Sequence, residues 1–108
     1  MEFLVEFEVN VPAGTPESEV KDRERGEAVA AAKLVDDGQL VRLWKLPVAG
    51  GATRALGLYR ADSEAELDGL IVALPLYEWM NVTVTPLAPH PNDSVAGASV
   101  SAAAGRQP

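Results

Sequence analysis

The sequence of 108 residues predicts an α+β domain whose strands and helices follow the order βαββαβ. Residues 2–11 alternate between apolar and polar side chains, as expected of a strand with one buried face. Two segments, at 15–37 and 63–74, have apolar residues at helical spacing between start and stop signals for helices. The remaining apolar segments are short and bounded by Gly or Pro, which favours strands.

The first strand is predicted at residues 2–11, and it presents one apolar face to the core. That face consists of every second residue: Phe3, Val5, Phe7, Val9 and Val11. The other face carries Glu2, Glu6 and Glu8. The simplest interpretation is that these acids form a solvated face. The alternative is that one of them supplies a second carboxylate near a binding pocket. Pro12 and Gly14 are expected to end the strand.

The first helix is predicted from Thr15 to Asp37. Thr15 is expected to cap its N-terminus, and Pro16 then occupies the first helical position. Glu17 places a negative charge at the positive end of the helix dipole. Gly38 supplies the residue with positive φ that commonly ends a helix.

Two strands are predicted next, at residues 40–46 and 53–60. The turn between them, at 47–52, contains Gly50 and Gly51. A glycine pair that no helix follows is typical of a turn and not of a phosphate-binding loop.

The second helix is predicted to begin at Ser63, because Ser63 and Glu66 form a capping-box pattern. Its apolar residues have helical spacing, and Pro75 is expected to end it. A connector at 76–80 leads to the fourth strand, at 81–87, where Val and Thr alternate.

This order of elements corresponds to the ferredoxin-like fold, a four-stranded antiparallel sheet with two helices on one face. We expect one domain at residues 1–92 and a disordered tail at 93–108, which is rich in Ser, Ala and Gly. Two helices cannot cover both faces of the sheet. Apolar side chains on the uncovered face therefore favour a homo-oligomer, at least a dimer, packed through the sheet.

The composition excludes several classes of function. A net charge of −7 argues against nucleic acid, and the absence of a run of lysines argues against an anionic membrane. The longest apolar stretch, at 70–76, is too short to span a bilayer, and the start of the chain has no signal-peptide pattern, so we expect a cytoplasmic protein. With no cysteine, one histidine and no spaced cluster of carboxylates, we expect neither a metal nor a cofactor.

Glu27 is the strongest candidate for a functional group. At 100° per residue it lies in a narrow sector of the first helix together with Val20, Ala31 and Leu34. A carboxylate on a buried stripe costs free energy unless it is paired or has a function. Apolar neighbours would raise its pKa, whereas Arg23, one turn earlier, would lower it by pairing. The alternative is a surface or interface glutamate on a slightly rotated helix.

Three segments resemble the muconolactone delta-isomerase family. They are Leu-Trp-Lys at 43–45, Leu-Pro-Leu-Tyr-Glu-Trp-Met at 74–80, and His-Pro at 90–91 after Leu87. The resemblance covers residues 1–94. It implies a ferredoxin-like fold and assembly from dimers into larger rings, typically decamers.

The resemblance also implies a reaction. Members of that family convert muconolactone to 3-oxoadipate enol-lactone by a 1,3-proton shift, without a cofactor, in the β-ketoadipate route of aromatic catabolism. The family's proton-transferring glutamate aligns with Glu27 without a gap, so the position on the helix and the resemblance select the same side chain as the catalytic residue. Such chemistry needs a base near the acidic carbon and donors for the substrate carboxylate and the developing enolate.

The sequence departs from the family pattern at two places. A family Gly-x-Tyr-Ala-Asn segment is replaced by residues 50–54, Gly-Gly-Ala-Thr-Arg, and Glu78 stands where proline is usual. Two alternatives therefore stay open. One is a related acid–base isomerase or cyclase that acts on a natural-product intermediate. The other is an oligomeric ligand-binding protein without catalysis.

Seven further residues are candidates for substrate binding: Trp44, Lys45, Arg54, Tyr59, Tyr77, Trp79 and His90. Lys45 takes the place of a family Arg and would hold a carboxylate or enolate, and its alternative is a salt bridge to a glutamate of the first strand. Arg42 and Lys45 are three positions apart on the same strand, so they are not expected to share a face of the sheet.

The aromatic residues of this set would line a pocket for a flat ligand, or they pack the core or an interface. Arg54 would bind an acidic group or is a solvated turn residue. His90 would reach a neighbouring subunit or cap a sheet edge.

Overall fold

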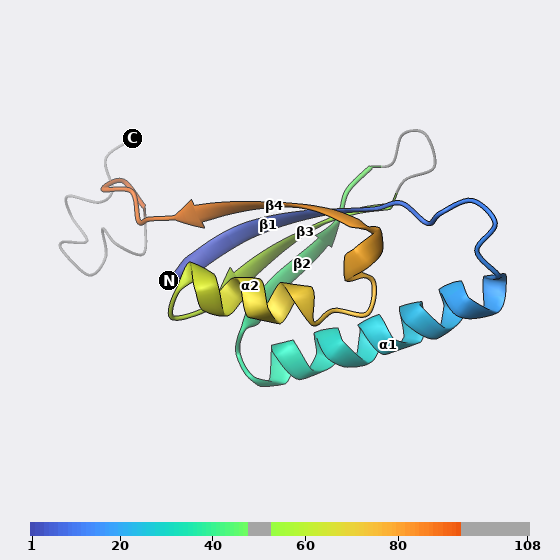
Figure 1. The fold of residues 1–108 in the computed structure, drawn as a ribbon. Helices are drawn as coiled ribbons and strands as arrows, with labels where there is room; N and C mark the ends of the chain where they lie inside the picture. Colours follow the sequence, from blue (N-terminus) through green and yellow to red (C-terminus); the bar gives the residue numbers. More distant parts are fainter. Residues whose placement is uncertain (48–52, 94–108) are drawn as a thin grey trace.

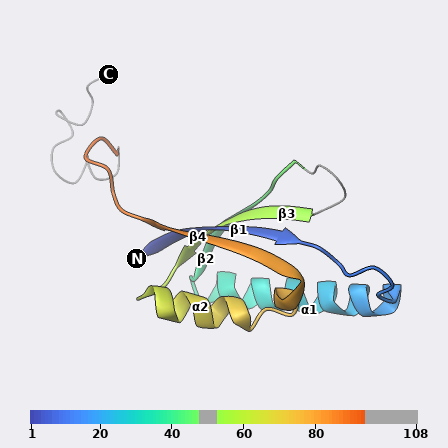
Figure 2. The same cartoon turned by 45° about the horizontal axis from the view of Figure 1, so that its top comes forward.

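A computed structural model describes residues 1–47 and 53–93 and confirms the ferredoxin-like fold. Four strands form a single sheet: β1 (Glu2–Val9), β2 (Leu40–Lys45), β3 (Thr53–Arg60) and β4 (Met80–Leu87). All neighbours pair antiparallel in the order β2-β3-β1-β4. Helices α1 (Glu17–Asp36) and α2 (Glu64–Val72) lie together against one face of the sheet (Figures 1 and 2).

Strand β1 lies in the middle of the sheet, and its apolar face forms the centre of the core, as predicted. Phe3 and Val5 are fully buried and Phe7 is nearly so. Leu67 and Ile71 of α2 pack against this face. The strand ends at Val9, so Val11, which the alternation placed on the strand, lies beyond it and is 43% exposed.

The start of α1 differs from the prediction, because Thr15 does not cap the helix. Pro16 is the N-cap residue, with extended backbone angles and no side-chain cap. The Thr15 hydroxyl instead donates to the Pro12 carbonyl oxygen at 2.7 Å, so it closes the turn that precedes the helix. The predicted end is confirmed: Gly38 has φ of 76°, and its amide donates to the Val35 carbonyl.

Helix α2 begins with the predicted cap. The Ser63 hydroxyl accepts a hydrogen bond from the Glu66 amide at 3.1 Å. The Glu66 carboxylate accepts from the amide of Asp62, one residue earlier than in a regular capping box. The helix ends at Val72, before Pro75, and a short 3₁₀ helix, η1 (Tyr77–Trp79), occupies part of the predicted connector.

The face of the sheet opposite the helices carries charged pairs between neighbouring strands. Arg54 pairs with Glu6, and Arg60 pairs with Glu2, all from β1 and β3. Arg54 therefore belongs to a strand and not to a solvated turn. The predicted turn lies partly and the predicted tail almost entirely outside the described residues, which leave out 48–52 and 94–108.

We predict that Leu67→Ala destabilises the protein by about 2–5 kcal/mol, because Leu67 is fully buried between α2 and β1 and its truncation leaves a cavity. Chemical denaturation followed by circular dichroism measures this change. Val29→Ala, at a position of α1 that is 72% exposed, is the control and changes stability by less than about 0.5 kcal/mol. Equal effects of the two substitutions would contradict the core described here.

Candidate active site

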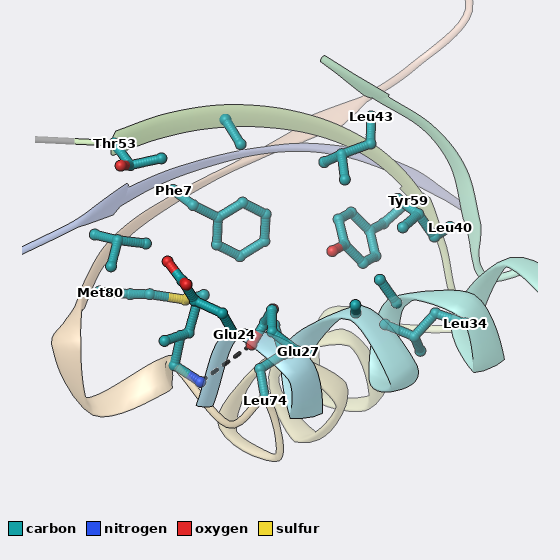
Figure 3. A pocket seen from close by; sticks show the side chains of 15 residues that line it. Phe7, Glu24, Glu27, Leu34, Leu40, Leu43, Thr53, Tyr59, Leu74 and Met80 are labelled. Atoms are coloured by element: carbon teal, nitrogen blue, oxygen red, sulfur yellow. Dashed lines mark hydrogen bonds between the residues drawn. The ribbon is translucent and has the colours of Figure 1, made fainter. Parts of the chain in front are cut away.

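A cavity of about 410 Å³ lies between α1 and the sheet (Figure 3). Its wall is mostly apolar, and most of it comes from α1, from β1 to β3 and from the segment before β4. The lining residues are Phe7, Val9, Glu24, Glu27, Ala28, Ala31, Leu34, Leu40, Leu43, Thr53, Ala55, Tyr59, Leu74, Leu76 and Met80. The polar groups in this list are two carboxylates, one phenol and one hydroxyl. Such a wall suits a small and largely apolar ligand.

Glu27 lies at this cavity, as the helix periodicity predicted. Its Oε1 accepts a hydrogen bond from the Leu76 amide at 3.1 Å, which fixes the carboxylate against the segment that follows α2. Within the described part of the chain, no group donates to the other oxygen, Oε2. Partial burial raises the pKa of Glu27 above its usual value, and the Leu76 hydrogen bond opposes this rise. The geometry therefore leaves one carboxylate oxygen available to a ligand.

Arg23 does not pair with Glu27, which corrects one prediction. Its guanidinium pairs with Glu19 and Glu78, and it donates to the Pro75 carbonyl oxygen at 3.1 Å. It also lies over the ring of Trp79, 4.3 Å from the ring centroid. Glu78 and Trp79 come from η1, so the guanidinium reaches across to that segment instead of toward the cavity.

Two contacts therefore hold α1 against residues 75–76. Arg23 binds the Pro75 carbonyl, and Glu27 binds the Leu76 amide. Gly26 lies between them on the helix, and a Cβ atom there would lie 3.2 Å from Cγ of Pro75. The absence of a side chain at Gly26 allows this close approach, which places the backbone donor next to the carboxylate.

Tyr59, for which the sequence left pocket lining and core packing open, lines the same cavity from the side of the sheet and also belongs to the core. It is only 3% exposed, and its ring lies against that of Phe7 with centroids 6.0 Å apart and planes at 59°. Burial and the nearby Glu27 carboxylate raise the pKa of Tyr59 to about 12. The phenol therefore stays protonated at neutral pH.

The two remaining candidates on β2 do not line the cavity in a single protomer. Trp44 lies on the opposite face of the sheet, paired in register with Leu56, and Arg42 lies over its ring at 5.0 Å. Lys45 pairs in register with Ala55, so it lies on the face of the cavity but beyond its lining residues. The alternative salt bridge from Lys45 to a glutamate of β1 is absent within the described residues.

The last four candidates also lie outside this cavity. Arg54 faces the open side of the sheet with Glu6, and Tyr77 is exposed and lines a separate hollow formed with residues of α2 and β4. Trp79 is buried under Arg23. His90 follows β4 and accepts a hydrogen bond from the amide of Asn92. Their roles in substrate binding stay predictions.

Among the lining residues, the sequence analysis identified only Glu27 and Tyr59 as site candidates, and it missed Glu24, Thr53 and Met80 among others. Glu24 precedes Glu27 by three residues, and side chains at that spacing share one side of a helix, so periodicity could have identified it. Thr53 and Met80 mark the starts of strands that only the folded sheet brings to α1. Within residues 1–47 and 53–93, no group of three potential metal ligands occurs and no helix is long and apolar enough to cross a membrane.

A carboxylate whose pKa is raised by partial burial at an apolar cavity is a candidate group for acid–base catalysis. The family model for muconolactone delta-isomerase matches residues 1–93. The chain therefore belongs to the muconolactone delta-isomerase family, a family of isomerases.

Curated relatives agree with this assignment. Muconolactone delta-isomerase 1 of Acinetobacter lwoffii is 34% identical over 95 residues, which cover 85% of this chain and 93% of the relative. Muconolactone delta-isomerase of Cupriavidus pinatubonensis is 32% identical over 92 residues, which cover 85% of this chain and 97% of the relative.

Solved structures show the same fold. A crystal structure of muconolactone isomerase matches with a TM-score of 0.73 and 25% identity, covering 84% of this chain and 92% of that one. A 5-chloro-2-hydroxyhydroquinone dehydrochlorinase from Burkholderia phenoliruptrix, in complex with 2,5-dihydroxybenzoquinone, matches with a TM-score of 0.58. It is 17% identical and covers 83% of this chain and 96% of its own, so it supports the fold alone.

We predict that Glu27→Gln raises the melting temperature at pH 7. A pKa raised by folding means that the favourable contribution of Glu27 is fully present below its unfolded pKa and is lost as pH rises through the folded pKa. Glutamine carries no charge and can still accept from the Leu76 amide. Each kcal/mol gained corresponds to roughly 4–8 °C for a domain of this size.

Melting curves between pH 4 and pH 8 measure this effect. The gap between variant and wild type should be largest at neutral pH and should narrow as pH falls toward the unfolded pKa. Asp36→Asn, on the exposed side of the same helix, corrects for the removal of one negative charge from α1. A gap that widens toward acidic pH would show that burial does not destabilise the Glu27 carboxylate.

Proposed function

We propose that this protein isomerises muconolactone to 3-oxoadipate enol-lactone, with Glu27 as both base and acid. The observation that carries the proposal is the state of the Glu27 carboxylate. One oxygen is held by the Leu76 amide, the other is unpaired within the described residues, and the group borders an apolar cavity. Partial burial raises the pKa of Glu27, which makes the carboxylate a stronger base than a solvated one.

The proposed reaction moves one proton between two carbons of the lactone ring. The Glu27 carboxylate removes the proton from the ring carbon next to the ring oxygen. The electron pair of that C–H bond moves through the ring double bond to the carbonyl oxygen and forms a dienolate. The Glu27 carboxyl group then returns the proton to the carbon beside the carbonyl, and the double bond ends one position further along the ring. No oxidant, reductant or cofactor is required.

We also propose that the protein acts as a homo-oligomer in the cytoplasm, as part of aromatic catabolism through the β-ketoadipate route. Two helices cover one face of the sheet, which leaves the other face free to pack against a second copy (Figure 2). Trp44 is 38% exposed on that face, and Leu87 is 39% exposed at the end of β4. A dimer formed in this way could build a larger ring such as a decamer.

The charge of the cavity favours a second candidate function. The described lining contains two carboxylates, Glu24 and Glu27, and no Lys, Arg or His. Residues 48–52, the Val-Ala-Gly-Gly-Ala segment that precedes Thr53, carry no charge either. Muconolactone bears a carboxylate that such a wall repels. A related isomerase or cyclase that acts on an uncharged natural-product intermediate would suit this wall better, unless a cation from another subunit completes the cavity.

We predict that the wild type converts muconolactone, and that Glu27→Gln lowers kcat by at least about 100-fold because the amide cannot accept the proton. Ultraviolet absorbance of the lactone follows the reaction, and Asp36→Asn serves as the control that retains wild-type activity. Full activity of the Glu27→Gln variant would remove Glu27 from the mechanism. Failure to convert muconolactone or any other enolisable lactone would favour the alternative of an oligomeric ligand-binding protein without catalysis.

A comparison of muconolactone with its methyl ester distinguishes an acidic substrate from an uncharged one, because the two compounds differ in charge at one group. For an uncharged natural substrate, we predict a higher kcat/KM for the ester. Added salt should then raise kcat/KM for the acid but not for the ester, because it screens the repulsion from Glu24 and Glu27. A higher kcat/KM for the acid at all salt concentrations would favour muconolactone and a cation supplied by another subunit.

A further inference from the structure

We propose that the Tyr59 hydroxyl is a second catalytic group of this cavity, and that it donates a hydrogen bond to the carbonyl oxygen on which the dienolate charge develops. The proposal rests on the proposed function, because it assumes a carbon acid bound beside Glu27. It assigns opposite tasks to the two sides of the cavity. The helix side moves the proton, and the sheet side stabilises the negative charge.

The first support is that the phenol faces the cavity without a protein partner. Tyr59 is 3% exposed, and within the described residues its hydroxyl makes no hydrogen bond. Every described side-chain oxygen or nitrogen that lacks a hydrogen bond keeps some accessible surface, and this includes the Tyr59 hydroxyl. The hydroxyl is therefore reached from the cavity. In Figure 3 it points into the space bordered by Glu27 on the opposite wall. Buried tyrosine hydroxyls usually have a partner, so an unsatisfied one in a cavity indicates a place for a ligand atom.

The second support is that the ring of Tyr59 is fixed by its neighbours. Phe7 packs against one part of the ring. Gly57, two residues earlier on β3, lies under another part, because a Cβ atom at Gly57 would lie 2.5 Å from Cε1 of Tyr59. Gly57 does not have positive φ, so the sheet needs glycine here for space and not for backbone conformation. The missing side chain leaves room for the ring, which directs the hydroxyl into the cavity.

The third support is chemical. Removal of a proton from the lactone places a negative charge on the carbonyl oxygen, in a cavity that already holds the carboxylates of Glu24 and Glu27. A neutral donor aimed at this oxygen offsets the repulsion, as donors do in an oxyanion hole. With its pKa raised to about 12, the phenol keeps its proton and remains a donor throughout the reaction. Removal of a single oxyanion donor lowers kcat by about 100- to 1,000-fold in other enzymes.

The first test is Tyr59→Phe, which removes the hydroxyl and keeps the ring. We expect kcat to fall by about 100-fold with KM nearly unchanged, because the hydrogen bond strengthens as charge develops. The melting temperature should not fall, since the hydroxyl has no partner in the described protein. Ser18→Ala, which removes an exposed hydroxyl of α1 outside the cavity, is the control and retains wild-type kcat. A Tyr59→Phe variant with wild-type kcat would overturn the assignment.

The second test asks whether Gly57 acts through the Tyr59 hydroxyl. Gly57→Ala forces the ring to move, so we expect it to lower kcat in the wild-type background. In the Tyr59→Phe background the same substitution should lower kcat little further, because the displaced ring no longer carries a donor. Equal losses in the two backgrounds would show that Gly57 acts through general packing and not through the hydroxyl.

The third test separates this proposal from the proposed function. The probe is an unsubstituted butenolide, furan-2(5H)-one, labelled with ¹³C at its carbonyl. Proton exchange with D₂O, followed by NMR, reports deprotonation by Glu27. The infrared carbonyl frequency of the bound probe reports the hydrogen bond, and we expect a shift to lower frequency in the wild type and none in Tyr59→Phe.

Exchange without a frequency shift would overturn the role of Tyr59 and leave the proposed function standing. A frequency shift that depends on Tyr59, without exchange, would support the donor and overturn the acid–base role of Glu27. A wild-type protein that does not bind the probe would overturn both.

Discussion

The hydrogen bond from the Leu76 amide to Glu27 determines how the rest of the site is arranged. It joins α1 to a segment 49 residues away, and it holds a charged group at the edge of an apolar cavity. Arg23 supports the same contact from the neighbouring carbonyl of Pro75 but pairs with Glu19 and Glu78, so its charge does not neutralise Glu27. The carboxylate is thereby positioned by a neutral donor, which fixes it in place while partial burial keeps it basic.

The two faces of the sheet carry different kinds of side chain. On the helix side, Phe7, Tyr59 and Leu34 form a largely apolar cavity around the Glu27 carboxylate. On the other side, charges are paired between strands, as with Arg54 and Glu6. This division follows from the alternation of side chains along each strand, since Glu6 and Phe7 are adjacent in the chain and face opposite ways. A single substitution on the open face can therefore leave the cavity unaltered.

The periodicity of the sequence predicted the strands and helices and the inward position of Glu27, because both depend on local geometry. The alternation at residues 2–11 identified the central strand, and a rotation of 100° per residue placed Glu27 on the inner side of α1. The sequence could not predict what depends on distant contacts. The Leu76 amide lies 49 positions from Glu27, and Arg23 had several acids within reach. Trp44 and Lys45 are adjacent, so only one of them could face the cavity side, and pairing with β3 decided which.

Gly26 lowers the stability of α1, and its contact with Pro75 gives the reason for a glycine at this position. Glycine in the middle of a helix is less stable than alanine by about 1 kcal/mol, because it loses more backbone entropy on folding. Here the bare backbone admits Pro75 to a distance that a methyl group would crowd. Helix α1 is therefore intrinsically less stable than it would be with alanine at this position, but it can pack closely against Pro75. Replacing this glycine to raise thermal stability would disturb the close approach that places the Leu76 amide beside the Glu27 carboxylate.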